Sequence, residues 1–272
     1  TPIPSAQIKS AIMLAALQAN GCTEISEEYQ SRDHSERMLG HMNAPLEVNG
    51  NTIRIEPGRL NAPEFLHVPG DLSSGAFFLA LGALIDGHGI AVHDVGLNPS
   101  RTGILDVLEK MGVTLKTGNN AHEFEPMGWV SAHKSEIQPI ELHGELLVRA
   151  IDEIPIIAVL ATQANGRSVI SEAGELRVKE SDRLATTAEF LNNMGAQVEE
   201  RPDGLIIDGP TKLHGTKVHP KHDHRIAMAA AIAGTIATEG DLTLIENAGC
   251  ADVSYPGFFD VLSELTDNPS RL

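Results

Sequence analysis

Residues 174–184 have the sequence GELRVKESDRL, which places five charged side chains within seven residues. Behind this stretch, apolar residues recur at i, i+4 and i+7 from Leu184 to Leu191, and Gly195 can stop a helix. We therefore expect a helix over about residues 181–194, with the charged cluster in its entry loop and first turn. Free backbone N–H groups and the positive end of the helix dipole favour anions there. The alternative interpretation is a solvated, salt-bridged helix start that binds no ligand.

The composition limits the classes of protein and partner. The 272 residues have room for one large or two modest domains. The sequence contains no uncharged apolar run of about 18 residues, the length that a membrane-spanning helix needs. The net charge of −17 argues against a nucleic-acid partner, but a few converging Arg and Lys side chains can still form a positive cleft. Cys22 and Cys250 are far apart and the first residues show no signal-peptide pattern, so we expect a reduced cytoplasmic setting.

The order of predicted elements recurs about every 70 residues. Each unit has a helix, a strand, a second helix and two further strands. The first helices have the sequences SAQIKSAIMLAALQANG, VPGDLSSGAFFLALGALIDG and RAIDEIPIIAVLATQANG, and a partial last copy begins with HDHRIAMAAAIAGTIATEG. Helices that alternate with strands imply crossover connections and mixed, largely buried sheets, so we predict an α+β fold. The loops that enter the second helices should gather on one face; they are SRDH, NPSRTG and RVKESDR.

A hinge is expected between the first and second units. Pro63 and the sequence VPGD at residues 68–71 interrupt the helix and strand patterns, and Asp71 is the expected N-cap of the next helix. We predict that residues 1–67 belong to one lobe and residues 68–272 to another. The first unit lacks the strand that precedes the helix of the later units, so we expect residues 1–67 to be the remnant of a lobe whose N-terminal part is missing.

Several motifs together resemble the 5-enolpyruvylshikimate-3-phosphate synthase family. They are RVKESDR, which is highly specific, with HDHRIAM, IDEIP, PGDLSS, and SAQ upstream of SRDH. The resemblance covers the chain end to end and implies two lobes of repeated βαβαββ units, with mixed sheets and buried helices, that close over a cleft. It implies transfer of the enolpyruvyl group of phosphoenolpyruvate to the 5-hydroxyl of shikimate 3-phosphate, in aromatic amino-acid biosynthesis, with no metal and no other cofactor.

The same resemblance has two further implications. The family's PGDKS-type and GNSGTTMR-type motifs are not in the sequence, which implies that a large N-terminal portion precedes it. The family is the target of glyphosate, and SAQIKSA and RDHSERM resemble its bacterial branch that tolerates this inhibitor.

The resemblance assigns roles to particular residues. Asp152 would take the proton of the attacking hydroxyl, Glu180 would handle the methylene proton, and Lys179 would touch the hydroxyl and the phosphate. Arg183 and Arg225, with Lys179, would bind phosphoenolpyruvate, because a planar guanidinium forms two parallel bonds to a carboxylate. The residues that would bind shikimate 3-phosphate are Ser5, Gln7, Ser31, Arg32, Asp152 and Lys179.

Simpler structural interpretations stand beside these roles. Asp152 could be the N-cap of the apolar helix that follows it. Lys179 could extend along the surface with its ammonium group in water. Arg225 could form a salt bridge with Asp223, two residues before it.

The sequence also departs from the family at some positions. Ala6 stands where some relatives have Ser, His34 where others have Tyr, and Val253 where many have Lys, so no base is assigned at that last place. His222 and His224 flank a carboxylate and resemble metal ligands, but the small residues that follow them fit close helix packing better.

Other functions are weighed against the transferase. The related transferase that acts on UDP-N-acetylglucosamine shares the fold, but it has a catalytic Cys loop and lacks RVKESDR. A non-catalytic fragment or a partner-binding module of the same fold is a second alternative. We expect only small-molecule partners, shikimate 3-phosphate and phosphoenolpyruvate, with no nucleic acid and no membrane; a fusion to another enzyme of the same pathway upstream is a further possibility.

Overall fold

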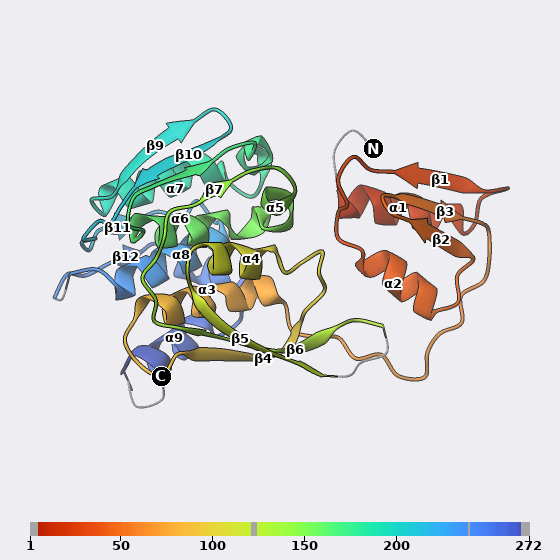
Figure 1. Cartoon of the computed structure of the whole chain (residues 1–272), viewed down its shortest axis with the longest axis horizontal. Coiled ribbons are helices and arrows are strands. Elements are labelled where there is room, and N and C mark those ends of the chain that lie inside the picture. Colours follow the sequence, from red (N-terminus) through yellow and green to blue (C-terminus); the bar gives the residue numbers. More distant parts are fainter. Residues whose placement is uncertain (1–4, 121–123, 239, 268–272) are drawn as a thin grey trace.

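The computed structural model of the chain describes residues 5–120, 124–238 and 240–267. Figure 1 shows two parts, a smaller N-terminal one in red and orange and a larger one, joined by an extended segment. Their buried apolar side chains form two separate clusters, one between Met13 and Ile55 and one between Leu72 and Leu262. The lobe boundary predicted between residues 67 and 68 falls between these clusters and stays a prediction.

The N-terminal part is a three-stranded antiparallel sheet, in the order β1-β3-β2, with two helices on one face. Ile53 and Ile55 alternate with more exposed residues along β3, and they pack against Met13 of α1 and Leu39 of α2. This period of two is what a strand with one buried face requires. The elements are α1 (Ala6–Ala16), β1 (Thr23–Ser26), α2 (His34–His41), β2 (Leu46–Asn49) and β3 (Thr52–Ile55).

The second unit repeats this order around a buried helix. Helix α3 is apolar on all sides and almost entirely buried, as expected of a helix inside a core. The predicted N-cap is confirmed, because Asp71 Oδ1 accepts a hydrogen bond from the Ser73 backbone N–H at 3.0 Å. The elements are α3 (Leu72–Leu84), β4 (Ile90–Gly96), α4 (Gly103–Lys110), β5 (Thr114–Asn120) and β6 (Met127–His133).

The third unit forms a mixed sheet of order β7-β8-β10-β9, in which β7 runs parallel to β8 and the other pairs are antiparallel. Its elements are β7 (Glu141–Leu142), α5 (Gly144–Arg149), the 3-10 turn η1 (Ile151–Glu153), α6 (Ile154–Thr162), β8 (Arg167–Ile170), the 3-10 turn η2 (Gly174–Val178), α7 (Arg183–Asn193), β9 (Gln197–Arg201) and β10 (Gly204–Asp208). A last partial unit has β11 (Lys217–Val218), α8 (His224–Thr235), β12 (Leu244–Ile245), the 3-10 turn η3 (Ala248–Val253) and α9 (Phe258–Asp267).

The strand order proves the internal repeat. In each three-strand set the last strand of the unit is central: β1-β3-β2, β4-β6-β5 and β8-β10-β9. In the later units a leading strand pairs in parallel with the next one, as β7 with β8, β11 with β12, and Gly70 with Val95 through a single bridge. The predicted α+β fold of repeated units, with mixed sheets and buried helices, is confirmed.

The buried first helices of the later units form the centre of the larger part. Helices α3, α6 and α8 contact one another, and Figure 1 shows them between the sheets. Ser73 in the first turn of α3 contacts both Glu153, at the start of α6, and Arg225, at the start of α8. The starts of the three helices therefore meet at one place. No helix among the described residues is long and apolar enough to cross a membrane.

The helix predicted over residues 181–194 is shorter at both ends. Helix α7 begins at Arg183, because Asp182 is the N-cap and accepts a hydrogen bond from the Ala185 backbone N–H at 3.0 Å. Ser181, which was expected inside the helix, instead donates its hydroxyl to Asp223 at 3.0 Å. The first turn of α7 is thus tied to the start of α8.

Candidate active site

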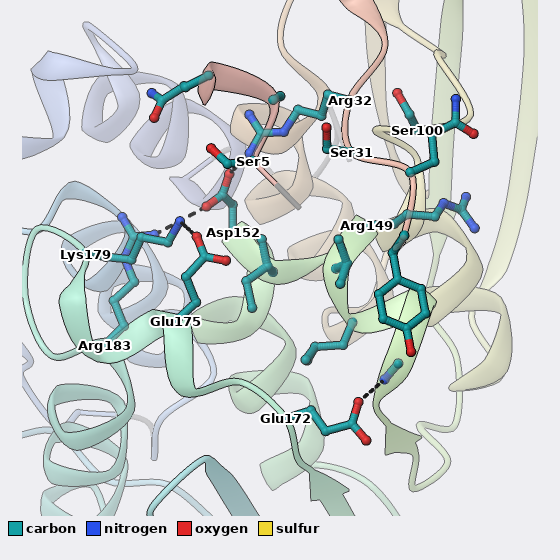
Figure 2. Close-up of a pocket in the computed structure, with 18 of the residues that line it drawn as sticks. Ser5, Ser31, Arg32, Ser100, Arg149, Asp152, Glu172, Glu175, Lys179 and Arg183 are labelled. Atoms are coloured by element: carbon teal, nitrogen blue, oxygen red, sulfur yellow. Dashed lines mark hydrogen bonds and ion pairs between the residues drawn. The ribbon is translucent and has the colours of Figure 1, made fainter. Parts of the chain in front are cut away.

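A cleft of about 600 Å³ lies between the two parts of the chain. Its walls are the start of α1, the loop before α2, the turn before α6, and the segment between β8 and α7. The structure brings every predicted site residue to this cleft: Ser5, Gln7, Ser31, Arg32, Asp152, Lys179, Glu180, Arg183 and Arg225. Figure 2 shows Asp152 near its middle, between Arg32 and the pair Lys179 and Arg183.

Arginines from four loops or helix starts surround the carboxylate of Asp152. Its Oδ2 atom lies 2.6 Å from Nη2 of Arg32, 3.2 Å from Nη1 of Arg101 and 4.0 Å from Nη2 of Arg225. Its Oδ1 atom lies 3.5 Å from Nη1 of Arg183. Arg32 meets this carboxylate across 120 positions of the sequence.

This environment controls the charge of Asp152. Burial alone would raise its pKa, but nearby cations outweigh burial and lower the pKa well below the usual range of an aspartate. In decreasing order of effect these cations are Arg225, Arg32, Arg101 and Lys179. Asp152 is therefore ionised at neutral pH.

The N-cap interpretation of Asp152 is wrong. It lies in η1, ahead of α6, and its side chain accepts no capping hydrogen bond there. Helix α6 instead starts at Ile154 with a proline in its first turn, where the missing N–H group costs nothing. The carboxylate of Asp152 thus does not cap the helix and faces the arginines.

Asp223 orients Arg183 rather than the side chain of Arg225. It is fully buried, accepts a bond from Nε of Arg183 at 2.8 Å, and caps α8 by accepting from the backbone N–H of Arg225 at 3.0 Å. The predicted alternative, an Asp223–Arg225 salt bridge, is therefore wrong: Nη1 of Arg225 donates to the Ser73 hydroxyl at 2.6 Å. Arg183 also pairs with Glu180, three residues before it.

Glu180 and Lys179 lie at the mouth of the cleft. The side chain of Glu180 is 50% exposed and contacts the otherwise buried Arg183. Lys179 pairs with Glu175, four residues before it, so it is not simply extended into water (Figure 2). Glu180 thus presents an exposed carboxylate beside the largely buried guanidinium of Arg183, which still lines the cleft.

The N-terminal part contributes hydroxyl and amide groups to the opposite wall. Ser5 caps α1, accepting from the Ile8 backbone N–H at 3.5 Å, and Gln7 is exposed in the first turn. Helix starts attract anions through their free N–H groups and dipole. This wall therefore presents a hydroxyl, an amide and free backbone N–H groups, which suit an anion.

A buried ion cluster positions Ser31, and the sequence did not predict it. Lys9 is 1% exposed, and its Nζ lies 2.9 Å from Oε2 of Glu27 and 2.7 Å from Oε1 of Glu36. Lys9 also donates to the Ser31 carbonyl at 3.3 Å, while the Ser31 hydroxyl donates to Glu27 at 2.7 Å. The loop that carries Ser31 and Arg32 is thereby fixed to α1.

The histidines do not form a metal site in the part of the chain that is described. Among those residues, no group of three or more His, Cys, Asp or Glu side chains could hold a metal ion. Burial, followed by the charge of Arg225, lowers the pKa of His224, so its ring is neutral at pH 7. His34 pairs with Glu125 outside the cleft, and Val253 is 83% exposed on η3.

Arg101 is the residue at Asp152 that the predicted site omitted. It belongs to the loop NPSRTG, which holds the same place in its unit as SRDH and RVKESDR hold in theirs. All three loops deliver a guanidinium to Asp152, from Arg32, Arg101 and Arg183. The repeat was therefore the signal that could have found Arg101.

The comparisons with known proteins agree with one another. The family model described as EPSP synthase (3-phosphoshikimate 1-carboxyvinyltransferase) matches residues 1–262. A 3-phosphoshikimate 1-carboxyvinyltransferase from Bacillus cytotoxicus is 47% identical over 97% of this chain and 62% of its own length. The solved EPSP synthase from Acinetobacter baumannii has a TM-score of 0.88 at 35% identity, over 97% of this chain and 61% of that one. The enolpyruvyl transferase NikO from Streptomyces tendae, at 23% identity and a TM-score of 0.77, shares the fold. The chain thus spans about 62% of the length of the curated relatives it matches.

Proposed function

The chain belongs to the EPSP synthase family, and on this premise we propose that the protein containing it transfers the enolpyruvyl group of phosphoenolpyruvate to the 5-hydroxyl of shikimate 3-phosphate. Phosphate is the second product, and the reaction belongs to aromatic amino-acid biosynthesis in the cytoplasm. The observation that carries the proposal is the single cleft in which arginines surround Asp152, with Glu180 and Lys179 beside it.

The anionic groups of both substrates match the cations of the cleft. We assign the carboxylate of phosphoenolpyruvate to Arg183 and Arg225, which stand in the first turns of α7 and α8 with Lys179 nearby. A guanidinium gives a carboxylate two parallel bonds, and the helix starts add to the attraction. We assign shikimate 3-phosphate to the opposite wall, with its contacts to Ser5, Gln7, Ser31, Arg32, Asp152 and Lys179.

The carboxylates of the cleft carry the proton transfers in this proposal. Asp152 takes the proton of the 5-hydroxyl as its oxygen bonds to C2 of phosphoenolpyruvate, and Glu180, in its protonated form, gives a proton to C3. The tetrahedral intermediate then expels phosphate, and Glu180 takes a proton back from C3 as the double bond reforms. The hydroxyl proton held by Asp152 passes to the released phosphate through solvent, which returns both carboxyl groups to their starting states. In this proposal Lys179, which lines the cleft, balances charge on the hydroxyl and on the leaving phosphate.

Glu180 is suited to this role by its exposure. Half of its side chain is accessible, so it can exchange protons with solvent between turnovers. The neighbouring Arg183 is 1% exposed and fixed by Asp223, so the partner that orients Glu180 does not move with it. An exposed proton carrier beside a fixed cation is a suitable arrangement for repeated proton transfer.

The rival acceptor is UDP-N-acetylglucosamine, and a direct assay separates the two. The full-length protein is given phosphoenolpyruvate with either acceptor, phosphate release is followed, and the product mass is measured. We expect phosphate release and an enolpyruvyl adduct with shikimate 3-phosphate only. Turnover with UDP-N-acetylglucosamine alone would reassign the substrate. Binding without turnover for either acceptor would favour a non-catalytic protein and refute the proposal.

A further inference from the structure

Arg101 approaches Asp152 from outside the cleft. Its Nη1 atom lies 3.2 Å from Oδ2 of Asp152, and its side chain is 11% exposed. Arg32, Arg183 and Arg225 line the cleft, whereas Arg101 lines a neighbouring hollow that it shares with Arg32 and Asp71. The four arginines therefore fall into two kinds, three that a bound anion can reach and one that lies behind the carboxylate.

The far side of Arg101 is anchored on carboxylates of the central helices. Its Nη2 atom lies 3.3 Å from both carboxylate oxygens of Asp71, the N-cap of α3, and its Nη1 lies 3.9 Å from Oε1 of Glu153. Burial disfavours the guanidinium charge, but Glu153, Asp71 and Asp152 outweigh it and raise the pKa of Arg101. Arg101 is thus a fixed cation held by the scaffold.

A substrate acts differently on the two kinds of arginine. The carboxylate and phosphate groups of the two substrates compete with Asp152 for the arginines on the cleft wall, because these arginines present their N–H donors to the ligand. Arg101 meets the ligand only across Asp152, so it keeps its contact. After both substrates bind, Arg101 is the cation that still determines where the Asp152 carboxylate points.

We infer that Arg101 is a positioning residue, which holds Asp152 in place for proton transfer while the substrates engage the other arginines. The inference rests on the proposed function and adds a residue to it. Arg101 itself touches no substrate. Its effect must therefore appear in turnover and in the pH dependence of turnover, and hardly in substrate affinity.

The charges around Asp152 determine in which direction its pKa moves when Arg101 is replaced. The charged groups that face it are Arg32 before α2, Arg101 before α4, Lys179 after η2, Arg183 on α7, Arg225 on α8, and the neighbouring Glu153 on η1. Asp152 must be ionised to accept a proton, so kcat falls as pH drops through its pKa in the substrate complex. Removing the charge of Arg101 raises that pKa, since an opposite charge within about 4–6 Å lowers a carboxyl pKa by roughly 1–3 units.

The test compares Arg101→Gln, Arg101→Lys and the parent, all as full-length protein. We expect Arg101→Gln to move the acid limb of the kcat profile upward by about 1 pH unit or more. Arg101→Lys should leave that limb in place, because the charge remains, but lower kcat about tenfold or more, because the two-pronged contact is lost. The KM of each substrate should stay within about threefold in both variants. Arg167→Gln is the matched control, since Arg167 forms an exposed pair with Asp208 on the outer sheet; it should leave the profile unchanged.

The outcomes separate this inference from the proposed function. A parent protein without enolpyruvyl transfer refutes the function itself. An active parent whose acid limb is the same in Arg101→Gln refutes the positioning role, even if kcat is lower. Thermal denaturation shows whether Arg101→Gln is folded. If it is not, Arg101→Lys provides the test. A tenfold lower kcat at unchanged KM supports the positioning role, and a kcat within twofold of the parent overturns it.

Discussion

Replacing Lys9 with methionine tests how the N-terminal wall of the cleft is held. Lys9 is 1% exposed and pairs with Glu27 and Glu36, whose side chains are 2% and 6% exposed. Methionine keeps the length of the side chain but leaves two buried carboxylates without a cation. Removing one partner of a buried ion pair costs about 3–5 kcal/mol, because the remaining charge stays desolvated. We expect Lys9→Met to lower the free energy of unfolding by that amount.

Glu27 and Glu36 differ in the hydrogen bonds that remain after Lys9 is replaced, which allows a second test. Glu27 still accepts from the backbone N–H of Ser31 at 3.2 Å and from its hydroxyl at 2.7 Å. Glu36 loses its cation, and its Oε2 atom is already buried without a hydrogen-bond partner among the described residues. Adding Glu36→Gln to Lys9→Met should therefore restore about half of the lost stability, since it removes the less satisfied of the two charges.

Urea unfolding of the full-length protein measures these differences from the midpoint and slope. Lys221→Met is the matched control, because Lys221 pairs with Glu189 at 2.8 Å but both side chains are about half exposed. It should change the free energy of unfolding by less than about 1 kcal/mol. A similar small loss for Lys9→Met, or no recovery in the double variant, would refute the buried-cluster reasoning.

The remaining predictions concern the cleft. Glu180→Gln and Asp152→Asn should each lower kcat by about 10²–10⁴-fold while the urea midpoint stays near that of the parent; a near-normal rate would remove that residue from the mechanism. Arg225→Lys should raise the KM for phosphoenolpyruvate about tenfold or more, since one ammonium cannot replace the guanidinium fork, and an unchanged KM would disprove the carboxylate assignment. Asp223→Asn keeps the cap of α8 but removes the negative charge that pairs with the buried Arg183. We expect the free energy of unfolding, measured with urea, to fall by about 1.5–3 kcal/mol. An unchanged free energy of unfolding would contradict the role of Asp223 as the anchor of Arg183.

Local chemistry explains what could be predicted from the sequence. Asp71 caps α3 as expected, since an N-cap depends only on the next few residues. The periodic return of helix and strand patterns predicted the units, and the strand order confirmed them. The same repeat predicted that loops from different units would meet, and the residues named for the site all line one cleft.

The pairing of charges could not be predicted, because it depends on contacts between distant residues. A salt bridge between Asp223 and Arg225, two positions away, was the alternative interpretation, yet Asp223 binds Arg183, which is 40 residues away. Lys9 lies on a helix whose sequence does not reveal that two glutamates will enclose it. Arg101 reaches a carboxylate 51 residues away, and the sequence prediction missed it, although the correspondence between repeated loops could have identified it.

Deuterium incorporation tests most directly whether the cleft moves a proton between Glu180 and the methylene carbon of phosphoenolpyruvate. The side chain of Glu180 is 50% exposed, so its carboxyl group exchanges with solvent. The full-length protein is supplied with both substrates in deuterium oxide, and the enolpyruvyl product is examined by proton NMR and mass spectrometry. We predict deuterium in the product methylene group, from addition of solvent-derived deuterium and loss of an original hydrogen. A product that retains only its two original methylene hydrogens would contradict the proposed addition and elimination.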